Sequence, residues 1–202
     1  MKANSQGKRT KGKLIKVALR CFSEHGVHNV TLQMVAKESK IERSLVTYYF
    51  KDTVELFKGV WDFVYNKALE ATIQKQKASK TAKEEILNYI QVSYEVFLSD
   101  KSIPKLYAQL FYLAAFHPEI LNINTNVKRV AVTRIAKIIM RGQSEEIFDR
   151  SLDPYLTAKT IHIGLTGVLL NYTSEIQEFD YGKIVDNYSK TILTSIQSVQ
   201  VD

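Results

Sequence analysis

The segment TLQMVAKESKIERSLVTYYF, residues 31–50, predicts a short helix, a tight turn and a second short helix. Thr31 precedes apolar residues at helical spacing and can act as the N-cap of the first helix. That helix is expected to end near Lys40, and the next to run from about Arg43 to Phe50. In such a pair, the second helix can lie in a DNA major groove.

The second of these helices has two distinct faces. Val46, Tyr49 and Phe50 share an apolar face that can pack inward. The outward face suits DNA, because arginine can bind guanine through two hydrogen bonds, serine and threonine can bind bases or phosphates, and tyrosine suits phosphates. The alternatives are core packing for Tyr48 and a solvated surface position for Arg43. The predicted DNA-binding residues are Thr31, Gln33, Arg43, Ser44, Thr47, Tyr48 and Lys51.

The excess positive charge is confined to the first part of the chain. Up to Lys58 there are 12 basic and 5 acidic residues, whereas the remainder has 16 of each. A confined basic region is typical of a protein that binds a polyanion, and a solvated basic arm is the alternative. An apolar helix is predicted to follow the arm and to end at Gly26. The predicted arm carries Lys8, Arg9, Lys11 and Lys13.

Three stretches together resemble the DNA-binding domain of the tetracycline-repressor (TetR) family. They are ALRCFSEHG at residues 18–26, TLQMVA at 31–36 and YYFKD at 48–52, the last followed by Leu56 and Phe57. A phenylalanine four residues before a glycine, a threonine-led second helix and an aromatic pair before a phenylalanine occur at the family's spacing. The resemblance covers residues 14–60 in detail and, beyond them, only an all-helical plan.

The resemblance implies an all-α fold with an N-terminal three-helix helix-turn-helix DNA-binding domain and a C-terminal helical ligand-binding and dimerisation domain. We predict the division between residues 1–52 and residues 53–202. The implied function is that of a sequence-specific transcriptional regulator. It would be a homodimeric repressor that a small-molecule effector releases from an inverted-repeat operator in double-stranded DNA.

Three positions depart from the family pattern. Lys40 stands where the turn usually has glycine, and a lysine in a left-handed conformation costs energy. Thr47 replaces a tyrosine that usually touches the DNA backbone, and Thr53 replaces a lysine that usually contacts phosphate. Neighbouring Lys51 can compensate for the second loss.

Two C-terminal helices are candidates for contacts between subunits. Residues 161–172 carry an apolar stripe, interrupted by glycines that permit close backbone approach. A last helix is expected from Asp180 to about Val199. In the resembling family two such helices form a four-helix bundle with those of a second subunit, and the alternative is that both are internal core helices. The predicted interface residues are Ile161, Gly164, Leu165, Val168, Tyr188 and Ile192.

Aromatic side chains are concentrated between residues 89 and 116, which hold 7 of the 21 aromatic residues. Ligand pockets have mostly apolar walls with a few polar groups, although aromatic residues at helical spacing also form ordinary core. We expect an apolar or aromatic ligand, cationic ones included, because no basic cluster marks this region as an anion site. The predicted ligand-binding residues are Tyr94, Phe97, Tyr107, Phe111, Tyr112 and His162.

The sequence carries no recognisable catalytic or metal-binding motif. Its four histidines belong to no such arrangement, a glycine-rich phosphate loop is missing, and the single Cys21 cannot form an internal disulfide. We therefore expect no enzyme activity, no cofactor and no metal. With no secretory or membrane segment evident, we expect a cytoplasmic protein without a membrane partner. The alternative function is a helical ligand-binding or catalytic protein whose basic N-terminal arm binds RNA or membranes non-specifically.

Overall fold

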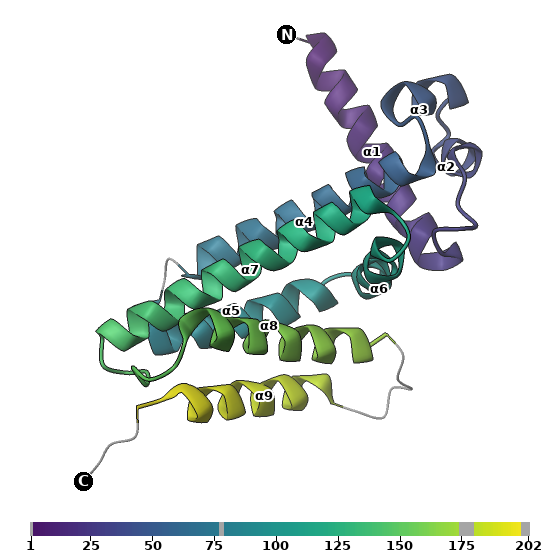
Figure 1. The fold of residues 1–202 in the computed structure, drawn as a ribbon. Helices are drawn as coiled ribbons and strands as arrows, with labels where there is room; N and C mark the ends of the chain where they lie inside the picture. Colours follow the sequence, from purple (N-terminus) through teal and green to yellow (C-terminus); the bar gives the residue numbers. More distant parts are fainter. Residues whose placement is uncertain (1, 77–78, 174–179, 199–202) are drawn as a thin grey trace.

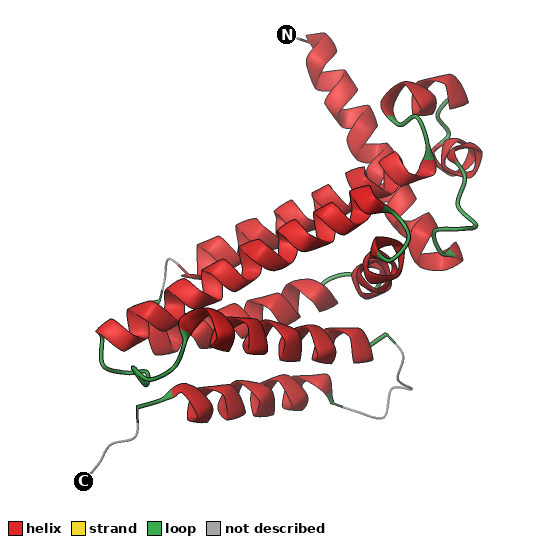
Figure 2. Ribbon diagram, viewed as in Figure 1, coloured by secondary structure: helices red, strands yellow, loops and turns green. Residues whose placement is uncertain are grey.

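The computed structural model describes residues 2–76, 79–173 and 180–198 (Figure 1). Within these ranges the chain forms helices joined by turns and loops, without a β-strand (Figure 2). This confirms the predicted all-α class. The helices are α1 (Lys2–His25), α2 (Leu32–Ser39), α3 (Arg43–Tyr49), α4 (Thr53–Gln76), α5 (Ala82–Leu98), α6 (Ser102–Ala114), α7 (Pro118–Ser144), α8 (Pro154–Asn171) and α9 (Tyr181–Ile196).

Helix α1 corrects one expectation about the N-terminus. The basic residues that were predicted to form an arm lie on the first turns of a helix that continues without interruption to His25. The helix buries Leu14 and Phe22 among its apolar side chains. It ends at Gly26, whose φ of 74° lies in the left-handed region and whose N–H donates to the Phe22 carbonyl at 3.0 Å.

The turn between α2 and α3 follows the predicted chemistry. Thr31 caps α2, because its side-chain oxygen accepts a 3.1 Å hydrogen bond from the Met34 N–H. Lys40 ends the helix in the left-handed conformation, with φ 54° and ψ 42°. That conformation costs a residue other than glycine about 1 kcal/mol. The Ile41 N–H donates to the Ala36 carbonyl at 3.1 Å and helps to hold the turn.

Helices α4–α9 form the larger part of the molecule. The long helices α4 and α7 are prominent in Figure 1, with α8 packed along α7 and α9 at the outer edge beside α8. Four helices of this part follow a capping residue: the side chains of Asp52, Thr81, Asp153 and Asp180 each accept a hydrogen bond from the main-chain N–H three residues on. The last helix ends at Ile196, and the predicted end at Val199 lies outside the described residues.

Helix α6 connects the N-terminal helices with the larger part, because it packs against α1 on one side and α7 on another. The rings of Phe22 on α1 and Phe57 on α4 also meet edge to face, with centroids 5.4 Å apart. The predicted division between residues 52 and 53 falls where α4 begins, but one hydrophobic core extends across it. A change in the larger part can therefore reach α1 through α6 and α4.

None of the helices in the described ranges has both the length and the apolar character that a membrane crossing requires.

Candidate functional site

Helices α2 and α3 and the residues beside them expose the predicted DNA-binding side chains. The structure exposes every residue that the sequence predicts to bind DNA: Thr31, Gln33, Arg43, Ser44, Thr47, Tyr48 and Lys51. Tyr48 is 79% exposed, whereas Val46 and Phe50 are buried beneath the surface. Tyr48 is therefore not a core aromatic, and its ring is nearly perpendicular to that of Tyr49 with centroids 5.2 Å apart.

The hydroxyl groups on this surface differ in their availability. Thr47 Oγ1 donates to carbonyls of its own helix, those of Ser44 at 2.9 Å and Arg43 at 3.2 Å, so that it is left mainly as an acceptor. Thr53 Oγ1 lies 3.4 Å from the Val30 carbonyl and is directed inward. Lys51 is anchored through its main-chain N–H, which donates to Glu55 at 2.9 Å, while its side chain is exposed.

A groove that the sequence did not reveal runs between α1 and the start of α3. Arg9, Lys13 and Lys16 lie on its α1 side, and Ile41 and Leu45 lie on the opposite side. The spacing i, i+4, i+7 places the three cations on one face of a helix. This spacing was visible in the sequence, but it carries meaning only once the segment is known to be helical rather than an extended arm.

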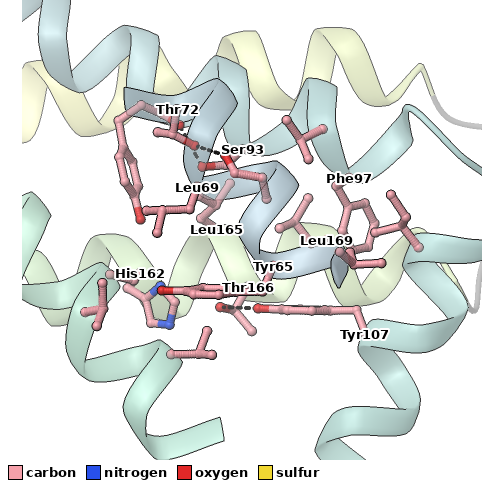
Figure 3. Close-up of a pocket in the computed structure, with 18 of the residues that line it drawn as sticks. Tyr65, Leu69, Thr72, Ser93, Phe97, Tyr107, His162, Leu165, Thr166 and Leu169 are labelled. Carbon is pink, nitrogen blue, oxygen red and sulfur yellow. Dashed lines mark hydrogen bonds between the residues drawn. The ribbon is translucent and has the colours of Figure 1, made fainter. Parts of the chain in front are cut away.

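The second candidate site is a cavity of about 150 Å³ inside the larger part of the molecule (Figure 3). Figure 3 shows His162 and Tyr107 entering from opposite sides, with Thr166 between them. The Tyr107 ring stacks on that of Trp61 with centroids 5.9 Å apart. The wall is mostly apolar and includes Val64, Leu69, Phe97, Leu165 and Leu169.

A few polar atoms of the lining have no partner within the protein. Trp61 Nε1 and His162 Nε2 are buried and make no hydrogen bond in the described part of the chain. Such buried orphan groups are uncommon and call for an explanation, and a bound water or ion is one that native structures often provide. Tyr107 Oη lies 3.5 Å from Thr166 Oγ1, which is at the limit of a hydrogen bond.

The protonation states around the cavity follow from its low polarity. Burial lowers the pKa of His162, and the nearby Lys128 ammonium lowers that pKa further, so the imidazole is neutral at pH 7. Burial raises the pKa of Tyr89 to about 12, with Arg134 acting in the opposite direction. The cavity lining contains no carboxylate.

The structure brings together half of the predicted ligand-binding residues. Phe97, Tyr107 and His162 line the cavity, whereas Phe111 lines a separate outer groove. Tyr94 lines neither hollow, and Tyr112 is half-exposed with its ring against His28. The sequence missed Trp61, Tyr65 and Arg134, because they lie on α4 and α7, outside the aromatic-rich segment.

The predicted subunit contacts do not fit the burial of the α8 side chains. Ile161 and Leu165 are only 1% and 3% exposed and face the chain's own core. Tyr188 on α9 donates a 2.5 Å hydrogen bond to the Ile161 carbonyl, and it occupies the space over Gly164. Val168 and Ile192 are also packed against the core. The outward side of α8 instead carries Leu156, Thr160, Ile163, Gly167 and Leu170, which follow the spacing i, i+4, i+7, i+11, i+14.

Within the described ranges, histidine, cysteine and acidic side chains form no group of three that could hold a metal ion. The single Cys21 is buried, and burial raises the pKa of its thiol. This fits a packing role rather than a redox one.

Comparison with known proteins agrees with this geometry. Residues 14–60 match the family model of bacterial regulatory proteins of the tetR family. The chain is 33% identical over 61 residues to the HTH-type transcriptional regulator AcrR of Shigella flexneri. That match spans 30% of this chain and 28% of the AcrR chain.

Two solved structures share the whole fold. A transcriptional regulator from Saccharomonospora viridis in complex with choline has a TM-score of 0.85 at 14% identity, over 95% of this chain and 100% of its own. The complex of SmeT with triclosan has a TM-score of 0.80 at 19% identity, over 96% and 94% of the two chains. SmeT is the repressor of the Stenotrophomonas maltophilia multidrug efflux pump SmeDEF.

Proposed function

We propose that the chain is a DNA-binding transcriptional regulator of the TetR family and acts as a homodimeric repressor that a small aromatic ligand releases from DNA. The observation that carries the proposal is that one hydrophobic core connects two candidate sites. An exposed recognition surface lies on α2 and α3, and a largely apolar cavity with orphan polar atoms lies on the other side of α6.

For DNA, we assign base contacts to Arg43 and Ser44 at the start of α3, with Thr47 accepting a hydrogen bond beside them. The start of a recognition helix is the part that reaches base edges in the major groove. Thr31, Gln33, Tyr48 and Lys51 would contact the phosphate backbone. The cations Arg9, Lys13 and Lys16 beside α3 would add affinity that is independent of sequence and depends on salt.

For assembly, we propose that the outward stripe on α8, from Leu156 to Leu170, packs against the same stripe of a second copy. Ile163 in the middle of this stripe is 61% exposed and Leu156 at its start is 66% exposed, so the stripe presents more than one apolar side chain to solvent in the single chain. A helix-turn-helix regulator reads an inverted repeat through two half-sites, so that a two-fold dimer is expected.

For the ligand, the cavity size favours a molecule with one aromatic ring in its interior. An apolar cavity of about 150 Å³ is large enough to hold benzene. Trp61 Nε1 can donate a hydrogen bond to the ligand, and neutral His162 can donate or accept one. Choline and triclosan are bound by the two proteins of similar fold described above. Their complexes support a small-molecule effector for this chain.

The proposal can be tested on DNA from upstream of the protein's own gene. We expect a footprint over an inverted repeat and a steep loss of affinity as salt rises. Replacing Arg9, Lys13 and Lys16 by glutamine should flatten the salt dependence without changing the preferred sequence. Salt-sensitive binding that ignores DNA sequence, or equal binding to RNA or anionic vesicles, would support the alternative function and refute this one.

A further inference from the structure

A second hollow adjoins the ligand cavity and has a different chemical character. It is a groove of about 470 Å³ between α6, α7 and α8, and its apolar lining residues are Phe111, Val132 and the largely exposed Ile163. His162 and Thr166 line both the groove and the inner cavity, so the two hollows meet at these side chains. Three cations border the groove: Lys128, Arg129 and Lys159.

The helices that border the groove hold few acidic residues. The stretches 120–144 on α7 and 154–171 on α8 contain no aspartate or glutamate, and α6 contains none either. The one acid of α7, Glu119, is paired at 3.0 Å with Lys58 on α4. In the described part of the chain, no ion pair neutralises any of the three groove cations.

The three cations differ in the contacts that they make. Lys128 Nζ lies 4.7 Å from the centre of the Phe111 ring in a cation–π contact. Arg129 donates a 2.7 Å hydrogen bond to Asn126, and Lys159 is exposed. Like charges held close together repel one another, and an anion placed between them relieves that repulsion.

This geometry corrects the expectation that no basic cluster marks an anion site. Lys128 and Lys159 lie outside the aromatic-rich segment in sequence, and only the packing of α7 and α8 against α6 brings them beside Phe111. A cationic ligand is disfavoured for the same reason, because neither hollow is lined by a carboxylate.

We infer that the effector is an amphipathic carboxylate, with its aromatic ring in the inner cavity and its carboxylate in the outer groove among Lys128, Arg129 and Lys159. This inference rests on the proposed function and specifies the ligand of the same site. His162 and Thr166, at the junction, contact the short chain that joins ring and carboxylate. A carboxylate that bridges these cations adds charged contacts between α7 and α8 to the apolar contacts that the ring makes with both helices.

Three probes of nearly equal size can test the inference, namely 3-phenylpropionate, 3-phenylpropanol and 3-phenylpropylamine. They share the ring and the chain and differ only in the head group. In isothermal titration calorimetry we expect the acid to bind about tenfold more tightly than the alcohol, because its hydrogen bonds are charge-assisted. The amine should bind more weakly than the alcohol. Added salt should lower the affinity for the acid and leave the affinity for the alcohol unchanged.

Variants should locate the carboxylate. Lys159→Gln and Lys128→Gln should each reduce the acid's affinity by up to about fivefold and leave the alcohol's affinity unchanged. Lys137→Gln is the matched control, since Lys137 is exposed on α7 and lines neither hollow. If the loss of the Lys128 contact with Phe111 prevents folding, the exposed Lys159 variant still decides the result.

The inference is overturned if the acid binds no more tightly than the alcohol. It is also overturned if Lys137→Gln lowers the affinity for the acid as much as Lys159→Gln does. It also fails if no probe binds at millimolar concentration. If the alcohol releases the operator and the acid binds no more tightly than the alcohol, the proposed function stands. Only the inference that the effector carries a carboxylate is then refuted. Absence of operator binding by the ligand-free protein would instead refute the proposed function.

Discussion

The side-chain amide of Gln109 on α6 donates a 2.9 Å hydrogen bond to the main-chain carbonyl of Phe22 near the end of α1. Tyr107, two residues earlier on the same helix, lines the ligand cavity. The helix that borders the cavity is thus tied directly to the helix that supports the recognition surface. A ligand that binds one position of α6 better than another can shift α1 through this bond, since only differential affinity moves such an equilibrium.

We predict that Gln109→Met weakens the coupling between ligand and DNA while leaving the fold intact. The Phe22 carbonyl keeps its hydrogen bond from Gly26, and the substitution also removes the buried, unpartnered Gln109 Oε1. The free energy of unfolding should therefore change by less than about 1 kcal/mol. The ratio of ligand affinities for free and DNA-bound protein should fall by about fivefold, measured by titration with and without operator DNA.

Lys105→Met is the control for this experiment, because Lys105 is exposed on the same helix one turn earlier. Its ratio of affinities should match that of the wild-type protein. An unchanged ratio in Gln109→Met would show that the bond to Phe22 does not carry the coupling.

A second prediction concerns base recognition by Arg43. Arg43→Ala should weaken operator binding by about 1–3 kcal/mol and relax the preference at one base pair, if the guanidinium binds a guanine. Fluorescence anisotropy with the operator and its single-base variants measures both effects. Arg150→Ala, which removes an exposed arginine far along the chain that pairs with Glu146, should change neither. Equal loss for every DNA sequence would reassign Arg43 to a phosphate.

The helix-turn-helix could be predicted from the sequence because its signals are local. Thr31 caps α2 through a residue three positions away, and Gly26 ends α1 through a hydrogen bond to Phe22. Apolar residues at helical spacing then identify the buried face of α3, which leaves its outer face for DNA. Each of these interactions joins residues within one or two helical turns.

The cavity could be predicted only in part, because it depends on packing between distant helices. On α5 the lining residues Tyr89, Ser93, Val96 and Phe97 share one face, and Tyr94 falls outside that face although it lies within the aromatic-rich segment. Trp61 comes from another helix, and no local pattern relates it to Tyr107, on which it stacks. Local sequence therefore gave the composition of the wall but not which side chains form it.

A third prediction follows from the lowered pKa of His162. Because the folded protein holds this imidazole neutral, the unfolded chain takes up its proton first as the pH falls below about 6.5. Above that pH the contribution of neutral His162 to the free energy of unfolding is complete. It is lost as the pH falls through the lowered pKa that His162 has in the folded protein. The cations that line the groove or the cavity together with His162 are Lys128, Arg129, Lys159 and Arg134, and the Lys128 ammonium opposes the protonation of the imidazole.

His162→Gln should therefore reduce the loss of unfolding free energy between pH 7 and pH 5, as measured by urea denaturation at each pH. His25→Gln removes an exposed histidine at the end of α1 and serves as the control. If the two variants keep the same acid dependence as the wild-type protein, the burial of His162 has no energetic consequence.

The last prediction separates packing within the chain from packing between copies, using two glycines on α8. A Cβ at Gly164 would lie 2.7 Å from Tyr188 Oη, whereas a Cβ at Gly167 would meet no atom within 4 Å. Gly164→Ala should therefore destabilise the fold, because overpacking costs about 1–3 kcal/mol and displaces the tyrosine from the Ile161 carbonyl. Gly167→Ala should instead gain up to about 1 kcal/mol from helix propensity.

Gly167→Glu then tests the subunit interface that we place on the outward stripe of α8. In a single chain this side chain points to open space and is tolerated. In a two-fold dimer the variant would bury two like charges near each other, so sedimentation velocity should show dissociation at concentrations where the wild-type protein is dimeric. A dimer unaffected by Gly167→Glu would place the interface elsewhere, and a monomeric wild-type protein would leave an inverted repeat without a two-fold partner to read it.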